Sequence, residues 1–348
     1  MTGKKIKSSQ LPSELRHDPV SHGWVVIATG RARRPEEFQR GGRRRVSPRK
    51  ITCPFENLKI SERPTAVFFQ GKRVKWQDVK GRAPSWSTIV LPNKYPAFSP
   101  SQEGVRNRRI GPYHATNGVG FHEVIVTRSH TQDIPHFQLW QVRELVEVYQ
   151  NRYLAFMREK FVNYISIFKN KGSEAGASLS HPHSQLIAIP VTDPDVERSL
   201  AGSFAFWRKH KKCAHCAMLQ WDLREKKRIV EENECFVALC PFASKVSFEI
   251  RIYPKAHTAY FERSNDYEKD CFSRVLFKSM RKLSSALRDP DYNYFIHTAP
   301  ADGRNYDHYH WHLEILPKTA TWAGFELGTG IEISTIEPEK AAAFLRKQ

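Results

Sequence analysis

Two histidines and a glutamine lie close together in the segment His181-Pro-His183-Ser-Gln185. If this segment is an extended strand, residues two apart project from the same face, so these three side chains line one surface. Imidazole and amide groups on one surface suit nucleophilic attack by a histidine, and they also suit a metal-binding or merely polar strand edge. The residue types alone leave both interpretations open.

The stretch before this strand contains Gly172 and Gly176, and these glycines favour the interpretation of the segment as the site of a histidine nucleophile. Glycines let backbone amides approach a ligand closely, and the side chains of Ser178 and Gln185 can donate hydrogen bonds to phosphoryl oxygens. A neutral imidazole attacks a phosphoanhydride phosphorus when its other nitrogen is held by an acceptor, which a backbone carbonyl near residue 181 would provide. Since this transfer needs mainly positioning and charge neutralisation, we predict a histidine nucleophile acting on phosphorus.

Three landmarks occur twice in the same order, which predicts two copies of one structural plan. The first copy has Cys53, a strand-like segment that ends at His130, a helix, and the His-Pro-His segment. The second copy has Cys213-Ala-His-Cys216, a strand that ends at His257, a helix, and the run 308–312. We therefore expect two halves, residues 1–195 and 196–348, of which the first carries the catalytic histidine and the second a zinc site.

The periodicity of apolar residues predicts the main elements. Spacing near 3.6 residues predicts long helices over 139–157 and 272–287, the second capped by Ser264 or Asn265. Short alternating runs predict strands at 24–29, 87–91, 164–169 and 294–298. Strands paired in meanders with a long helix between them indicate an α+β fold with a mainly antiparallel sheet and helices packed on it.

The net charge of +19 is the strongest feature of the composition. Lysine and arginine attract polyanions, so a basic zinc-containing nucleic-acid-binding protein is an alternative from a different class. However, the basic residues form several short clusters instead of one stripe, and this class leaves residues 181–185 unexplained. A basic surface that collects anionic metabolites is the simpler interpretation, and binding of nucleic acid is not expected.

The cysteines and apolar stretches bear on the compartment. Six cysteines in 348 residues are too few for a disulfide scaffold, so reduced thiols are expected. No apolar run approaches the roughly 20 residues of a membrane-spanning helix, and the N-terminus has no apolar secretory core. We expect a cytoplasmic protein that does not bind membranes.

The spacing Cys213-x-x-Cys216 is typical of a tetrahedral zinc site, although it can also arise by chance. His257 and one histidine of the run 308–312 would complete the site, and the register of the internal repeat points to His308. In the first half, Cys53, His130 and His181 are the corresponding ligands of a second structural zinc ion.

The segment 168–185, with Asn170, Gly172, Ser178 and the His-Pro-His run, resembles the active-site signature of galactose-1-phosphate uridylyltransferases, a branch of the histidine-triad superfamily. Residues 18–35 are similar to that family's N-terminal signature, and 324–330 to its C-terminal sugar-contacting segment. The resemblance implies a duplicated histidine-triad fold and a homodimer in which the partner completes each active site. It also implies ping-pong transfer of a nucleoside monophosphate between a nucleotide sugar, most directly UDP-glucose, and a hexose 1-phosphate.

The resemblance also assigns individual residues. It implies that His183 carries the nucleotidyl group, that Gln185 steadies this intermediate, and that Glu326 contacts the hexose. The residues implied at phosphate groups are Arg31, Arg34, Asn170, Gly172 and Ser178. For the metals, it implies Glu56 where zinc-bearing relatives have a second cysteine, and His310 in place of His308.

Two departures from the family pattern keep alternatives open. Residues 320–323 lack the family's lysine, and 324–330 look closer to the related ADP-glucose phosphorylases, so adenylyl transfer is the alternative reaction. A dinucleoside-polyphosphate phosphorylase would share the same nucleophile. Some relatives instead bind a metal with residues that correspond to His297, His310 and His312, but those relatives lack the Cys-x-x-Cys.

Overall fold

The computed structural model describes residues 13–28, 37–38, 50–56, 58, 63–79 and 86–348. Its strands are β1 (Glu14–His17), β2 (Trp24–Ile27), β3 (Ala66–Phe69), β4 (Lys72–Val74), β5 (Thr88–Pro92), β6 (Asn107–Ile110), β7 (Tyr113–Thr116), β8 (Phe121–Thr127), β9 (Tyr164–Lys171), β10 (His183–Ile189), β11 (Ile229–Glu232), β12 (Phe236–Leu239), β13 (Ile250–Pro254), β14 (Tyr292–His297), β15 (His312–Pro317) and β16 (Glu332–Ser334). Its α-helices are α1 (Trp76–Val79), α2 (Leu139–Phe156), α3 (Pro194–His210), α4 (Ala214–Glu225), α5 (Asp266–Leu287), α6 (Gly324–Thr329) and α7 (Pro338–Arg346). Short 3-10 turns are η3 (Lys50–Thr52), η4 (Ile134–His136), η5 (Ser173–Ala175) and η6 (Phe261–Arg263).

One antiparallel sheet runs through the molecule in the order β11-β12-β13-β15-β14-β9-β10-β8-β5-β3-β4. The order has an internal symmetry about the junction of β14 and β9. On one side β15 lies between β14 and β13, and on the other β10 lies between β9 and β8. This topology confirms the expected α+β fold with a duplicated unit, and it joins both copies in a single sheet.

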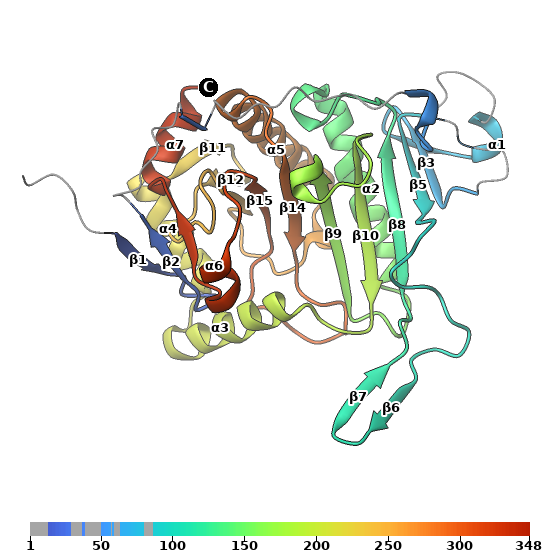
Figure 1. Cartoon of the computed structure of the whole chain (residues 1–348), viewed down its shortest axis with the longest axis horizontal. Helices are drawn as coiled ribbons and strands as arrows, with labels where there is room; N and C mark the ends of the chain where they lie inside the picture. The colour runs from blue at the N-terminus through green and yellow to red at the C-terminus, as the bar shows by residue number, and fades with distance from the viewer. Residues whose placement is uncertain (1–12, 29–36, 39–49, 57, 59–62, 80–85) are drawn as a thin grey trace, which may run out of the picture.

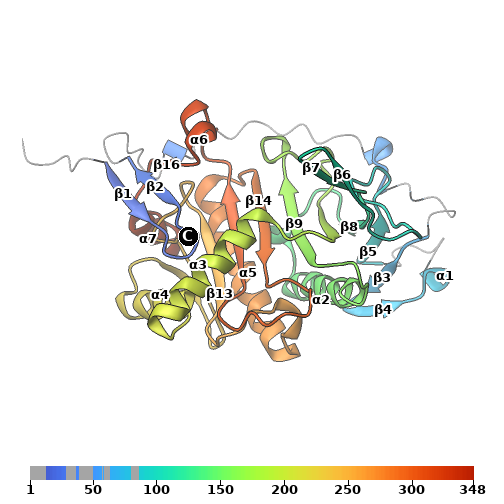
Figure 2. The ribbon, with the colours of Figure 1, turned by 90° about the horizontal axis from the view of Figure 1, so that it is seen from below.

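Helices α2 and α5 cover the same face of this sheet (Figure 2). Both follow the predicted apolar periodicity, and α5 begins with the capping box of Asn265 and Glu268, as the sequence indicated. Leu287 is its last residue, one before Arg288, which takes a left-handed conformation. The buried faces of these two helices and of the central strands form the main hydrophobic core.

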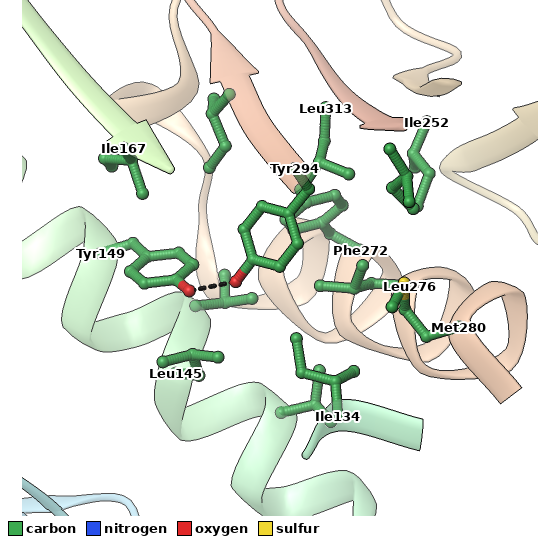
Figure 3. Close-up of a cluster of buried hydrophobic side chains, with 14 of the residues drawn as sticks. Ile134, Leu145, Tyr149, Ile167, Ile252, Phe272, Leu276, Met280, Tyr294 and Leu313 are labelled. Atoms are coloured by element: carbon green, nitrogen blue, oxygen red, sulfur yellow. Dashed lines mark hydrogen bonds between the residues drawn. The ribbon is translucent and has the colours of Figure 1, made fainter. Parts of the chain in front are cut away.

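The core contains a buried polar contact as well as apolar packing (Figure 3). The hydroxyls of Tyr149 on α2 and Tyr294 on β14 are hydrogen-bonded, among Ile134, Leu145 and Leu276. Tyr149 also bonds the hydroxyl of Ser184 at 2.6 Å. Because unpaired buried hydroxyls are costly, these contacts fix how α2 sits on the middle of the sheet.

The sequence did not indicate the helices at the join of the two halves. Helix α3 spans the expected junction of the halves at residues 195 and 196. It starts at an Asp193 cap followed by Pro194, and α4 follows directly after Cys213. Separately, β2 lies between β1 and β16 in a small sheet, so residues 24–27 and 332–334 lie side by side. The β6–β7 hairpin projects from the body of the molecule in Figure 1.

Candidate active site

Strand β10 begins at His183, and alternation along the strand decides which way this residue faces. Ser184 and Leu186 point to the face that α2 covers, so His183 and Gln185 point to the opposite face. The Nδ1 atom of His183 lies 2.8 Å from the carbonyl oxygen of His181. Since a carbonyl only accepts, Nδ1 carries the proton and the lone pair of the neutral ring is on Nε2.

The environment of His183 favours the neutral ring. The side chain is buried, and burial lowers its pKa, while the hydrogen bond to the His181 carbonyl acts in the opposite direction. The ring of Phe55 lies against it, with ring centroids 5.5 Å apart. A neutral imidazole with its Nδ1 proton already bonded has the geometry that a histidine nucleophile requires.

Gln185 is oriented by His122, a residue that no sequence motif singled out. The Nε2 atom of His122 on β8 lies 2.8 Å from the amide oxygen of Gln185. The backbone amide of Ala97 donates to Nδ1 of His122, so Nε2 carries the proton and donates to Gln185. With its oxygen held in this way, the Gln185 amide has its NH₂ group to offer as a donor on the surface that carries His183.

The loop before β10 requires glycine. Gly172 has a φ of +83°, and a Cβ atom built there would lie 1.9 Å from the carboxylate of Asp291. That carboxylate accepts from the amide of Glu174 at 3.0 Å, which shapes the η5 turn. At the end of β9, Asn293 donates to the side-chain oxygen of Asn170 at 2.7 Å, and Ser178 lies exposed on the loop.

A first cluster of possible metal ligands lies directly beside this strand: Cys53, His130 and His181. The Nδ1 atoms of the two histidines are 3.2 Å apart, and that of His181 is 3.6 Å from the sulfur of Cys53. The other nitrogen of His181 donates to the carbonyl of Thr127, so its lone pair faces the cluster. Burial lowers the pKa of His181 to about 4, which keeps the ring neutral.

Glu56 approaches the same point. Its Oε1 atom lies 3.7 Å from Nδ1 of both His130 and His181, while Oε2 lies 3.3 Å from Arg128. Oε1 is buried and has no hydrogen-bond partner among the described residues. A buried carboxylate oxygen beside two imidazole nitrogens and a thiol offers the donor types of a four-coordinate zinc site.

The second cluster consists of Cys213, Cys216, His257 and His310. The sulfur of Cys216 lies 3.3 Å from Nδ1 of His257 and 3.5 Å from Nδ1 of His310. The Nε2 atoms of these histidines donate to backbone carbonyls of Asp307 and Pro254, so both lone pairs face the sulfurs. A hydrogen bond from Cys216 lowers the pKa of Cys213, and together with the two inward lone pairs this suits a closed, soft-ligand metal site.

The histidine run 308–312 is divided among different surroundings. His308 is not in the metal-ligand cluster, and its ring instead contacts Phe204 at a centroid distance of 5.1 Å. His312 lies near His297 and Glu314 in a separate group. None of the six cysteines, all of which are described, forms a disulfide.

Two family models match this chain. The family model described as the N-terminal domain of galactose-1-phosphate uridyl transferase matches residues 5–192, and a domain of unknown function matches 114–347. The chain is 32% identical over 338 residues to an ADP-glucose phosphorylase from Arabidopsis thaliana, covering 96% of this chain and 92% of the relative. It is 30% identical over 346 residues to a galactose-1-phosphate uridylyltransferase from Thermotoga maritima, covering 96% and 98%.

The chain belongs to the galactose-1-phosphate uridylyltransferase family.

Solved structures of this family agree with the fold. An Arabidopsis thaliana ADP-glucose phosphorylase with bound ADP-glucose superposes with a TM-score of 0.77 at 29% identity, covering 97% of this chain and 99% of the other. A uridylyltransferase superposes with a TM-score of 0.71 at 25% identity, covering 96% and 97%. The chain is thus an enzyme of the nucleotidyltransferase class, as the resemblance in its active-site segment indicated.

The family resemblance also implies Arg31, Arg34 and Glu326. Arg31 and Arg34 lie outside the described residues. Glu326 is on α6, where its carboxylate accepts from the amide of Ala323 at 3.0 Å. In Figure 1, α6 lies away from the loop that joins β9 to β10. Within the described residues, no helix has the length and apolar character to cross a membrane.

Proposed function

We propose that this enzyme transfers a nucleoside monophosphate from a nucleotide sugar to a hexose 1-phosphate through a covalent nucleotidyl-His183 intermediate, with UDP-glucose as the donor. The observation that carries the proposal is the hydrogen bond of 2.8 Å from Nδ1 of His183 to the His181 carbonyl. This bond fixes the tautomer whose Nε2 is the nucleophile, on the same face of β10 as Gln185.

The first half-reaction needs no proton transfer. The lone pair of Nε2 forms a bond to the α-phosphorus while the bond from that phosphorus to the oxygen of the sugar phosphate breaks, and the hexose 1-phosphate leaves with the electron pair. The ring becomes positively charged, and its Nδ1–H is already bonded to the His181 carbonyl, which stabilises that charge. The second half-reaction is the reverse displacement by another hexose 1-phosphate.

Donors around this position would neutralise the phosphoryl oxygens. Gln185 is oriented for this by His122, and Asn170 by Asn293. The backbone of the loop at Gly172 and the hydroxyl of Ser178 are further donors. Arg31 and Arg34 remain predicted contacts to the two phosphates of the nucleotide, and Glu326 remains a predicted contact to the hexose.

The relatives also support a second candidate, adenylyl transfer from ADP-glucose. The similarity to the Arabidopsis thaliana ADP-glucose phosphorylase, in sequence and in structure, favours it. A phosphorylase would release the nucleotidyl group to inorganic phosphate instead of a sugar phosphate. None of the contacts described at His183 and Gln185 involves a base, so the chemistry of the step is common to both candidates.

We also propose two structural zinc ions, a homodimer, and a division of the chain into halves at residues 195 and 196. The ligands would be Cys213, Cys216, His257 and His310 in the second half, and those of the first half would be Cys53, Glu56, His130 and His181. The orphaned oxygen of Glu56 and the inward lone pairs of His181, His257 and His310 support both sites. A cytoplasmic location stays a prediction.

The decisive experiment uses donors labelled at the α-phosphorus. Pure enzyme is incubated separately with labelled UDP-glucose and ADP-glucose, and acid-labile label on the protein is measured. The labelled enzyme is then chased with galactose 1-phosphate, glucose 1-phosphate or inorganic phosphate. Label from UDP-glucose that is released only to sugar phosphates supports the uridylyltransferase, whereas label from ADP-glucose that is released to phosphate supports the alternative. No label from either donor would refute both.

A further inference from the structure

The hydrogen-bonded ladder between β9 and β10 ends before the nucleophile. The register runs from Ile189 opposite Tyr164 to Gln185 opposite Phe168 and does not continue to His183. In the second half, the corresponding strands β15 and β14 stay paired up to His312 opposite His297. The catalytic half therefore lacks a stretch of backbone pairing that its duplicate retains.

A buried lysine lies at the place where the pairing stops. Nζ of Lys169 on β9 is 3.3 Å from the carbonyl oxygen of His183 and 3.0 Å from the carboxylate of Asp133. Alternation along β9 puts Lys169 on the face that α2 covers, behind the strand from which the His183 ring projects. Lys169 and Asp133 are each only 2% exposed.

The carboxylate that faces Lys169 is itself fully bonded. Asp133 caps η4 by accepting from the amide of Ile134 at 2.8 Å, and it accepts from the hydroxyl of Tyr292 at 2.8 Å. A buried ion pair of this kind generally adds less stability than apolar side chains of the same volume would. Stability alone therefore gives little reason for a lysine at this position.

The second half of the chain has an apolar residue at the position that corresponds to Lys169. Aligning the two ladders on Gln185 and Glu314, each opposite a phenylalanine, makes Ile296 the counterpart of Lys169. Ile296 is buried in the hydrophobic core, beside strands whose pairing is intact. Lysine thus replaces an apolar residue only in the half where the carbonyl next to the nucleophile is released from its neighbouring strand.

The three consecutive carbonyls around the nucleophile all accept from side chains. The His181 carbonyl accepts from the ring of His183, that of Pro182 from the hydroxyl of Thr127 at 3.3 Å, and that of His183 from Lys169. The Lys169 contact links this segment, through the carboxylate of Asp133, to η4 in the main core. A shift of the segment would move Nε2 relative to phosphorus, and displacements of about 1 Å can cost roughly 100-fold in rate.

We propose that Lys169, neutralised by Asp133, is a positioning residue that holds the His183 peptide where the sheet opens and so aims Nε2 at the α-phosphorus. The inference rests on the proposed function, since it concerns the same nucleophile. His183 keeps its pairing with Val126 of β8, and on the β9 side the buried ammonium gives the anchoring that the missing pairing would have given. Lys169 does not touch the substrate.

The test replaces Lys169 by the isoleucine found at its counterpart in the second half and Asp133 by the neutral amide. The double variant Lys169→Ile with Asp133→Asn removes both charges, so no buried carboxylate is left unpaired. We expect a melting temperature close to that of the wild type, unchanged affinity for the donor, and formation of the nucleotidyl-enzyme slowed by roughly 10- to 100-fold. Lys169→Arg, which keeps a charged donor, should be slowed less. Arg228→Met with Asp222→Asn, which removes another buried ion pair, should label at the wild-type rate.

A second measurement does not depend on activity. In protein labelled with ¹⁵N-histidine, the bonded Nδ1–H of His183 should give a signal protected from exchange, assigned by its loss in His183→Ala. We expect the double variant to lose this protection. If it keeps both the protection and the wild-type labelling rate, the positioning role is wrong. If the wild type takes no label from either donor, the proposed function fails, and the protection of the signal still decides whether Lys169 orders His183.

Discussion

His183 and His312 occupy equivalent positions in the two copies of the fold, and each lies with its Nδ1 atom at the carbonyl of the histidine two residues before it. The distances are 2.8 Å for His183 and 3.2 Å for His312. The backbone of each copy therefore fixes the tautomer in which Nδ1 carries the proton. What differs is the surroundings, because Glu314 stands where the first half has Gln185.

The carboxylate of Glu314 changes what its site can bind. Although burial acts in the opposite direction, Lys245 and Arg251 lower its pKa to about 2, so it is ionised and ion-paired. The ring of Tyr253 stacks on His312 with centroids 4.8 Å apart. An ionised carboxylate and a covering ring disfavour a phosphate group at this position, which supports our proposal that the transfer chemistry belongs to the half with Gln185.

Introducing that carboxylate into the first half should abolish most of the activity. We expect Gln185→Glu to slow nucleotidyl transfer by about 100-fold or more, because a donor to the phosphoryl oxygens becomes an anion. Gln185→Asn, which keeps the amide, should be less severe. The labelling rate at saturating donor measures the effect. A Gln185→Glu enzyme that is labelled as fast as the wild type would show that this side chain does not face the phosphate.

The nucleophile itself has a direct test. His183→Ala should lower transfer by at least about 1,000-fold and leave no acid-labile label, since solvent cannot replace the covalent step. The melting temperature should change little. His183→Gly should regain part of its activity when imidazole is added, because free imidazole can enter the vacated space. Normal turnover by His183→Ala would contradict the mechanism.

The sequence alone predicted the long helices, the antiparallel sheet and the duplication, because apolar periodicity and repeated landmarks extend over many residues. It did not predict α3, which spans the expected junction of the two halves, or α4, which follows Cys213. It also missed His122 and Lys169, which act through long-range contacts with β10. Nothing in the local sequence distinguishes Lys169 from an ordinary surface lysine on a strand, so only the structure reveals its partner Asp133.

The metal sites give a prediction about stability. Cys213→Ser should lower the zinc content by one ion per chain and the melting temperature by several degrees, while the labelling rate of the remaining folded enzyme changes little. The physical reason is that the four ligands are closed around the metal and none of them is the nucleophile. Cys240→Ser is the matched control, because Cys240 lies in none of the possible metal-ligand clusters of the described residues, and the zinc content of this variant should stay at the wild-type level. Wild-type enzyme purified without chelator that contains no zinc would rule out the site.

The last prediction concerns Glu326, which the family resemblance implies at the hexose but which lies on α6, away from the β9–β10 loop of its own chain. If the partner of a homodimer supplies it, Glu326→Ala should weaken use of the hexose 1-phosphate by roughly 10-fold, since a lost hydrogen bond to a charged group costs about 1.5–3 kcal/mol. Formation of nucleotidyl-His183 should continue if the donor is saturating.

Dimers that combine one His183→Ala chain with one Glu326→Ala chain, isolated through two different tags, should have one site with both residues intact. Such hybrids should therefore use low concentrations of hexose 1-phosphate better than either parent. Hybrids no better than Glu326→Ala dimers at half the enzyme concentration would place Glu326 in the site of its own chain or outside the site altogether.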